Sequence, residues 1–302
     1  MDFLDDTLLK AILDFLPGQF RFIASVNRRF RSNYHHAPTT LYTAAMTSDG
    51  TREIWLQEDE VNVRGGIRSR LDENEENIEE NGCILAAQYG NLEALHWLRS
   101  RDCGWNYRVC AAAAAGGHVH IVHWARSQEP PCPWDARVCE MAARYGRLDA
   151  LQCLRSQEPP CPWDESACTA AAAHGRLDVM QWLRSQTPPC PWDKRACNEA
   201  ARYGRLELLQ WMRSLTPPCP WDEWTCAAAA GRGQLAVLQW MRSQTPPCPW
   251  DELTCEAAAA DGELTVVQWL REQTPPCPWN IHRCLAFTES GSELEVFIRS
   301  QL

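Results

Sequence analysis

Apolar and polar residues follow a pattern that returns every 29 residues from residue 81 to residue 302. In the copy spanning residues 161–189, the stretch after Asp164 is rich in alanine and has no helix breaker before Gly175. This predicts a helix with Asp164 as its N-cap, because a short carboxylate can accept hydrogen bonds from the free amides of the first turn. Gly175 suits the left-handed residue that ends such a helix.

A second amphipathic helix is expected after the glycine in every copy. In the same copy its apolar face consists of Leu177, Met180, Trp182 and Leu183. Arg184 falls in the last turn, where a cation complements the helix dipole. Paired prolines then stop the helix. The chain therefore reads helix, tight turn, helix and proline-rich loop, repeated about eight times when the two incomplete end copies are included.

The repeat accounts for an unusual composition, since it holds 14 of the 16 cysteines and 18 of the 20 prolines. One set of cysteines, which we call the loop cysteines, comprises Cys103, Cys132, Cys161, Cys190, Cys219, Cys248 and Cys277. A second set, the helix cysteines, lies seven residues later in each copy and comprises Cys110, Cys139, Cys168, Cys197, Cys226, Cys255 and Cys284. Self-similarity at this period is typical of stacked repeat proteins. The sequence thus predicts an all-α solenoid of helix-turn-helix repeats over residues 81–302.

Two segments precede this array. Residues 39–56 carry Ala44, Ala45, Gly50 and Trp55 in the order of a repeat, and we interpret them as a degenerate copy that caps the stack. Residues 57–80 contain nine acidic residues against three arginines, which is typical of a solvated, flexible linker.

The string AAAHGRLDVMQWL and its six other copies resemble the core pattern of ankyrin repeats. The resemblance implies a binding protein whose first helices line a concave, partner-contacting face. The copies depart from that family in three ways. The period is 29 residues in place of about 33, the Thr-Pro-Leu-His tetrapeptide is missing, and the projecting finger is shortened to PPCPWD.

Residues 1–38 are similar to an F-box, with an acidic start, a Leu/Ile-rich helix, a Pro17-Gly18 break and then Val26-x-Arg28-Arg29-Phe30. In that family the segment docks on a Skp-type adaptor of a cullin ubiquitin ligase, and the repeats hold the substrate. This chain has Leu4-Asp5 where the family has Leu-Pro. A plain helical cap for the solenoid is the alternative interpretation.

Charge narrows the classes of partner. The formal charge is −10, which gives no general attraction to phosphate backbones or anionic membranes. Charged residues interrupt the most apolar N-terminal stretch, so neither a signal peptide nor a membrane span of about 20 residues is expected. We therefore predict a monomeric intracellular protein, in the cytoplasm or the nucleus, that binds another protein and neither nucleic acid nor membranes.

The cysteines and histidines are the candidates for metal or redox chemistry. Structural zinc normally uses more closely spaced cysteine pairs, and a helix cysteine falls on a face that is otherwise alanine, so we expect buried, free thiols. His118, His120 and His123 lie close in sequence but lack an acidic companion at ligand spacing. No nucleophile, phosphate-binding or zinc-protease motif occurs. We predict no catalysis, no metal and no cofactor, with a thiol-based metal-binding or redox protein as an alternative.

Tryptophan marks two positions of each copy. Trp182 and its equivalents are expected in the core, whereas the Trp of each PPCPWD loop is expected to cover the neighbouring copy. Trp224 occurs in one copy only, so it is a candidate exposed anchor.

Positions that differ between copies are free to specify a partner, whereas constant positions hold the stack. The variable positions lie before the turn glycine and after the capping aspartate. The candidate partner-binding residues are Gln88, Tyr89, Arg144, Tyr145, His174, Lys194, Arg202, Tyr203, Glu223, Trp224 and Arg232. Tyr, Trp and Arg are enriched at binding hot spots. The sequence thus favours a protein-protein interaction scaffold, with a ligase substrate-recognition subunit as the alternative if residues 1–38 act as an F-box.

Overall fold

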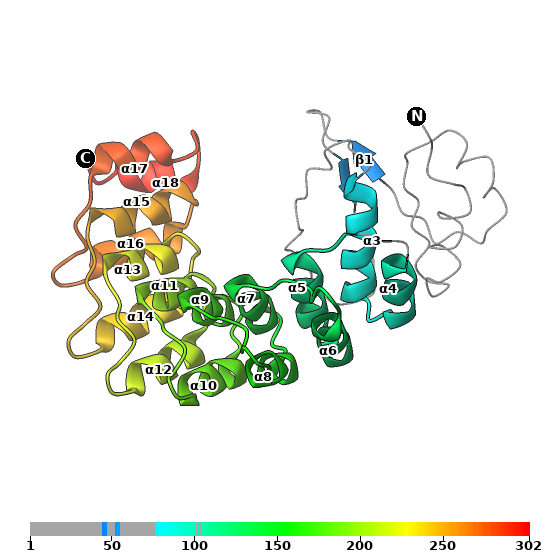
Figure 1. Ribbon diagram of the computed structural model, residues 1–302. Helices are drawn as coiled ribbons and strands as arrows, with labels where there is room; N and C mark the ends of the chain where they lie inside the picture. Colours follow the sequence, from blue (N-terminus) through cyan, green and yellow to red (C-terminus); the bar gives the residue numbers. More distant parts are fainter. Residues whose placement is uncertain (1–43, 47–51, 55–75, 101, 103) are drawn as a thin grey trace. The chain divides into compact units, whose positions relative to one another are not determined.

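The computed structural model describes residues 44–46, 52–54, 76–100, 102 and 104–302 of the chain (Figure 1). The chain divides into two compact units, Met1–Trp105 and Asn106–Leu302, which we describe separately. The division falls inside the array that the sequence begins at residue 81. The F-box-like segment 1–38 lies outside the described residues, so its helices and its adaptor contact stay predictions.

The first unit contains two short strands and a helix pair. Strands β1 (Ala44–Met46) and β2 (Arg52–Ile54) pair antiparallel, with Ala44 opposite Ile54. Helices α3 (Glu76–Gln88) and α4 (Leu92–Arg99) follow. The strands lie where the sequence predicted a degenerate helical repeat over 39–56, so that prediction was wrong for the described residues. Helix α3 also begins inside the predicted linker 57–80.

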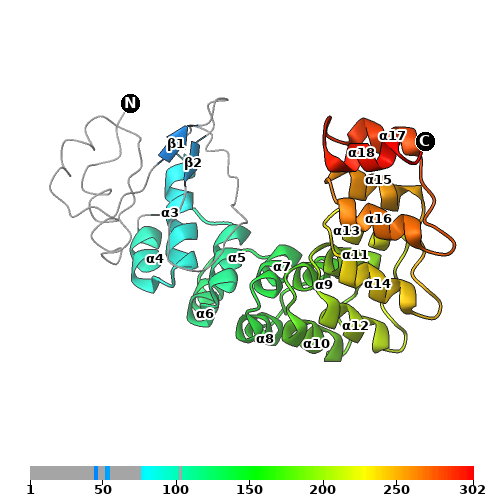
Figure 2. The same ribbon diagram turned by 180° about the vertical axis from the view of Figure 1, so that it is seen from behind.

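The second unit is an array of seven helix pairs, each a first helix, a glycine turn and a second helix (Figure 1). The first helices are α5 (Tyr107–Gly116), α7 (Ala136–Arg144), α9 (Glu165–Ala173), α11 (Lys194–Arg202), α13 (Glu223–Ala230), α15 (Glu252–Ala260) and α17 (Ile281–Phe287). The second helices are α6 (Val119–Ser127), α8 (Leu148–Ser156), α10 (Leu177–Ser185), α12 (Leu206–Ser214), α14 (Leu235–Ser243), α16 (Leu264–Glu272) and α18 (Glu293–Arg299). Each first helix from α5 to α15 packs against the first helix of the next pair. The second helices form a parallel row, best seen from behind (Figure 2). This arrangement is the all-α solenoid that the sequence predicted.

The predicted helix limits are confirmed, and local chemistry explains them. The Asp164 carboxylate accepts a hydrogen bond from the Ser166 amide at 2.9 Å, which satisfies a free donor of the first turn of α9. Gly175, in the turn between α9 and α10, has φ +67°, a conformation that costs a residue with a side chain about 1–2 kcal/mol.

The core consists of alanine and cysteine from the first helices and Leu, Val and Met from the second helices. Small side chains let neighbouring first helices approach closely. The helix cysteines are fully buried, as predicted, and so are the described loop cysteines. The second-helix tryptophans, however, are half-buried, which corrects their predicted place in the core. Trp182 instead packs edge-to-face on the loop residue Trp163, with ring centroids 6.0 Å apart.

The six proline-rich loops that connect successive pairs follow one design, and a cis peptide bond joins the first proline of each loop to the residue before it. Arg184, at the end of α10, donates from Nη1 to the backbone carbonyl of Cys190 at 2.5 Å, and its guanidinium lies 4.2 Å from the centre of the Trp192 ring. Five other arginines make both contacts, and together we call the six the loop arginines: Arg126, Arg155, Arg184, Arg213, Arg242 and Arg271. Arg184 lies in the last turn of α10, as the sequence predicted, and the structure adds a hydrogen bond that fixes the loop.

Candidate partner-binding face

The face formed by α7, α9 and α11 carries an open cavity of about 370 Å³. Three candidate residues, Arg144, His174 and Tyr203, line it together with polar side chains that also vary between copies, such as Thr169 and Asn198. Variable residues from three consecutive copies therefore meet at one hollow. Glu140 and Glu199 also line this cavity, so it carries charges of both signs.

Ion pairs hold two candidate arginines beside the cavity. Arg144 pairs with Glu140 at 2.8 Å and Arg202 pairs with Glu199 at 3.6 Å, each within its own helix. These pairs are more than a third exposed on the arginine side, where ion pairs contribute about 0–1 kcal/mol to stability. The arginines are therefore positioned by their glutamates while part of each guanidinium stays accessible.

His174 ends α9 and is exposed at the same face. Burial of part of its ring lowers its pKa from the ordinary value of 6.5, and the positive charges of Arg144, Arg176 and Arg205 lower it further. At neutral pH the imidazole is therefore uncharged. The three arginines reveal a positive potential at this end of the first helices.

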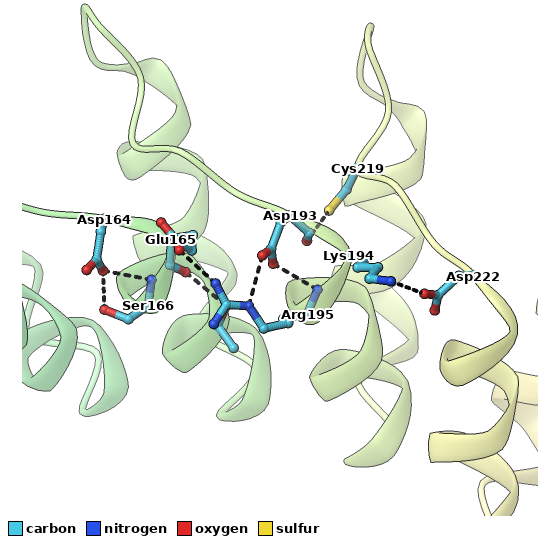
Figure 3. Close-up of polar contacts among 9 residues, drawn as sticks. Asp164, Glu165, Ser166, Asp193, Lys194, Arg195, Cys219 and Asp222 are labelled. Carbon is cyan, nitrogen blue, oxygen red and sulfur yellow. Dashed lines mark hydrogen bonds and ion pairs between the residues drawn. The ribbon is translucent and has the colours of Figure 1, made fainter.

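The candidate residues at the start of the first helices belong to a different cluster (Figure 3). Lys194 pairs with Asp222, the N-cap of the next copy, at 2.7 Å. Its neighbour Arg195 bridges two copies, since it contacts Glu165 and Asp193 at 2.8 Å each. Lys194, which the sequence assigned to partner binding, therefore links two adjacent copies of the stack.

Exposed aromatic side chains complete the face. Trp224, the second residue of α13, is 55% exposed, so its predicted exposure is confirmed. Tyr203 is 48% exposed at the end of α11, while Tyr145 at the equivalent position is half-buried. Glu223 and Arg232 are exposed at opposite ends of α13.

The remaining candidates, Gln88 and Tyr89, follow the same pattern in the first unit, at the end of α3. Both are half-buried. Because the two units are described separately, the structure does not join them to the cavity. Of the predicted set, it brings together Arg144, His174 and Tyr203 around one hollow.

The thiols form pairs that sequence reasoning missed. Each pair joins a helix cysteine to the loop cysteine 22 residues later: Cys110–Cys132, Cys139–Cys161, Cys168–Cys190, Cys197–Cys219, Cys226–Cys248 and Cys255–Cys277. The 29-residue period draws attention to equivalent cysteines, which hides a spacing of 22. The Cys197 Sγ also lies 3.8 Å from the Cys219 carbonyl oxygen, and the Cys219 thiol donates to the Asp193 carbonyl at 3.5 Å.

This pairing affects thiol chemistry. The Cys219 thiol, followed by burial, raises the pKa of Cys197 well above its ordinary value. Burial raises the pKa of Cys284, in the last helix pair, to about 12. Because the thiolate is the nucleophile and the metal ligand, these groups are poorly suited to redox or metal chemistry at neutral pH.

The three clustered histidines do not form one site. The rings of His118 and His120 lie edge-to-face with centroids 5.9 Å apart. His123 Nε2 instead lies 3.3 Å from the Cys153 Sγ, and its Nδ1 lies 3.2 Å from the Gln157 amide. In the described part of the chain, no three His, Cys, Asp or Glu side chains are grouped as a metal ion would require.

Within the described ranges, no helix combines the length and the apolar composition needed to cross a bilayer.

No protein-family model matches the chain, and no curated protein matches its sequence. Among solved structures, the chain is similar to the human ASB11 ankyrin repeat domain, with 14% identity and a TM-score of 0.34, over 73% of this chain and 97% of that one. It is also similar to the pentatricopeptide repeat protein PPR10 in complex with an 18-nt psaJ RNA element, with 18% identity and a TM-score of 0.30, over 74% of this chain and 40% of that one. Scores this low say nothing about the molecule that this chain binds.

Proposed function

We propose that the protein is an interaction scaffold that binds another protein on the face formed by α7, α9, α11 and α13. One observation carries the proposal. The variable residues of three consecutive copies, Tyr203 among them, meet on this face around a cavity of about 370 Å³, and Trp224 is exposed on the next first helix, α13.

The division of labour between constant and variable residues supports this proposal. In each loop the constant Arg donates to the Cys carbonyl and stacks on the Trp ring, and the Cys thiol donates to the carbonyl of a capping Asp, so these constant residues hold the stack. Trp and Tyr are enriched at binding hot spots, so the exposed Tyr203 and Trp224 are candidate anchors for a partner.

A role as the substrate-recognition subunit of a cullin-type ligase is the finer form of this proposal. Its support is the F-box-like motif within residues 1–38, where Val26, Arg28, Arg29 and Phe30 follow the Pro-Gly break. In that form, a Skp-type adaptor would bind the N-terminal segment while the array holds the substrate.

Affinity capture with three forms of the full chain tests the proposal. The first is the native chain, the second carries His174→Ala, Tyr203→Ala and Trp224→Ala, and the third is a control with Gln181→Ala, Gln210→Ala and Gln239→Ala on exposed positions of the second helices. A partner that is lost with the second form and kept with the control supports the proposal. Equal recovery of every captured protein with all three folded forms contradicts it.

A fourth form, which lacks residues 1–38, addresses the ligase role. Loss of a Skp-type adaptor with this form, while the array's partner is retained, is the expected result. Failure of the native chain to capture any such adaptor would exclude the ligase role without affecting the scaffold proposal.

A further inference from the structure

The glycine turns between first and second helices form one edge of the array, which we call the turn edge. Three arginines at this edge are oriented in the same way. Arg147, Arg176 and Arg205 each immediately precede a second helix, and we call them the turn arginines. Each donates from Nε to a backbone carbonyl of the preceding copy. The acceptors are Ala115 at 2.9 Å, Arg144 at 3.4 Å and Ala173 at 3.3 Å, in that order.

The glycine turn makes room for this contact. A Cβ placed on Gly146 would lie 3.0 Å from Cδ of Arg176, and one on Gly175 would lie 2.9 Å from Cδ of Arg205. Each aliphatic stem thus lies across the glycine of the preceding copy. The packing and the Nε hydrogen bond together restrict the side chain before any ligand arrives, which reduces the conformational entropy that binding would cost.

The terminal nitrogens of the turn arginines remain exposed. Within residues 104–302, none of the three arginines has an ion-pair partner at contact distance, whereas Arg144 and Arg202 pair with glutamates. Each turn is followed two residues later by one exposed carboxylate: Asp149, Asp178 or Glu207. The arginine charges are felt at this surface, since the positive charges of Arg144, Arg176 and Arg205 lower the pKa of His174, after burial of its ring.

The row of arginines is limited to three copies. The equivalent position is His118 in the preceding copy, then Gln234 and Glu263 in the two following copies. Asp261 adds a second negative charge at the last of these turns. The residue before the second helix is therefore an arginine in the middle of the array and a glutamate towards its C-terminal end.

We propose that the turn arginines bind an extended acidic protein segment whose Asp or Glu residues occur at every third position. This inference rests on the proposed scaffold function and specifies the chemistry of the partner.

The repeat geometry dictates the spacing of the acidic residues. Neighbouring packed helices lie about 8–10 Å apart, so successive turn arginines are separated by about the same distance. An extended chain in the polyproline II conformation has three residues per turn and advances about 3.1 Å per residue, so every third side chain lies on the same side at intervals of about 9 Å. A guanidinium recognises a carboxylate through two parallel hydrogen bonds, and its exposed Nη atoms are available for such contacts.

A nucleic-acid backbone fits these observations less well. Binding to phosphates depends on neutralisation of many charges by a strongly basic surface. Here the row contains three arginines, carboxylates flank it, and the whole chain has a charge of −10.

Fluorescence anisotropy with the full chain and synthetic peptides tests the inference. The probe is a labelled Ser/Gly peptide with Asp at every third position. Two controls have the same length, one with its Asp residues adjacent and one with Lys in place of Asp. We expect the spaced peptide to bind about tenfold more tightly than the Lys peptide, with an affinity that falls as salt is added. Equal binding of the spaced and adjacent peptides would overturn the proposed geometry.

Variants locate the binding site. Arg147→Gln, Arg176→Gln and Arg205→Gln together should weaken binding of the spaced peptide by about tenfold. The control Arg108→Gln, Arg137→Gln and Arg299→Gln removes the same charge elsewhere and should have an effect of about twofold or less. Asp178→Asn provides a test that leaves the arginine contacts intact, and it should strengthen binding. Equal weakening by the two triple variants, or weaker binding after Asp178→Asn, would contradict the inference.

A labelled single-stranded RNA of equal charge separates the two classes of macromolecule. Tighter binding of this RNA than of the spaced peptide would overturn the assignment to an acidic protein segment. Failure of this inference is also distinguishable from failure of the scaffold proposal. If replacement of Tyr203 and Trp224 abolishes capture of a protein but the chain does not bind the spaced peptide, only the inference about acidic segments fails.

Discussion

Each of the three central copies contains a loop arginine and a turn arginine, and the two have different roles. At the edge of the array formed by the proline-rich loops, which we call the loop edge, Arg213 donates from Nη1 to the Cys219 carbonyl at 2.6 Å and stacks on Trp221. On the turn edge, Arg205 uses its Nε for the Ala173 carbonyl and leaves its terminal nitrogens exposed. The same residue type therefore holds a loop in one place and presents charge in the other. The two arginines differ in the guanidinium nitrogen that donates to a backbone carbonyl: Nη1 in Arg213 and Nε in Arg205.

Replacement of the two arginines should produce the largest difference between the edges. Arg213→Ala removes a charged hydrogen bond to a carbonyl and a stacking contact, and we expect a loss of about 2–3 kcal/mol in the free energy of unfolding. Arg205→Ala should cost less than about 1 kcal/mol because its guanidinium is largely solvated. Urea denaturation of both variants, followed by circular dichroism, measures this. An equal loss would show that the turn arginine is also a structural element.

Replacement of a turn glycine should cause the next largest loss of stability. Gly175→Ala combines a φ of +67° with the approach of the new Cβ to Arg205, so we expect a loss of about 1–2 kcal/mol. Gly262→Ala is the matched control, since its φ is +77° but nothing lies within 4 Å of the added Cβ. The difference between the two variants in thermal unfolding isolates the arginine contact. Arg205→Ala in the Gly175→Ala background should remove that difference.

The buried thiol pairs of the loop edge should contribute less. Cys197→Ala removes one sulfur from a fully buried pair, and we expect a loss of about 1 kcal/mol in stability. The same burial should protect the thiols of the native chain from an aromatic disulfide reagent at neutral pH, whereas all 16 cysteines should react after denaturation. Rapid reaction of most thiols in the folded chain would contradict the packing of the loop edge.

The smallest effect concerns His174 on the opposite edge. Its pKa in the folded chain is lowered from 6.5, first by burial and then by the charges of three arginines. The unfolded chain therefore binds the proton more readily, so stability decreases as the pH falls through 6.5 and this loss is complete below the folded pKa. His174→Gln should make the melting temperature less sensitive to a change from about pH 7.5 to about pH 5.5. An unchanged pH dependence would show that the charges of these three arginines do not act on His174.

Much of the local structure could be predicted from the sequence. The alanine-rich stretch, the capping aspartate and the turn glycine locate α9 and α10, because each of these signals acts within a few residues of chain. The exposure of Trp224 could be predicted because it interrupts the pattern of a single copy. The strand pair Ala44–Met46 and Arg52–Ile54 was missed, since the pair Ala44-Ala45 favoured a helical copy.

The candidate site could be predicted only in part. Variation between copies indicated Arg144, His174 and Tyr203, which line the cavity, but it also indicated Lys194, which pairs with a neighbouring cap. The turn arginines escaped notice because nothing in one copy shows that their Nε groups reach a carbonyl 32 residues earlier.

The sequence by itself determined the period, the helix pairs, their caps and turns, and hence the solenoid, because these depend on interactions between residues close together in the chain. Only the tertiary structure decided which thiols meet, which arginines fix a loop and which ones face solvent. The thiol pairs and the turn arginines depend on contacts between neighbouring copies, 22 to 32 residues apart, and the loop arginines on a loop that folds back to a helix end six residues earlier. How the helices stack sets the geometry of these contacts.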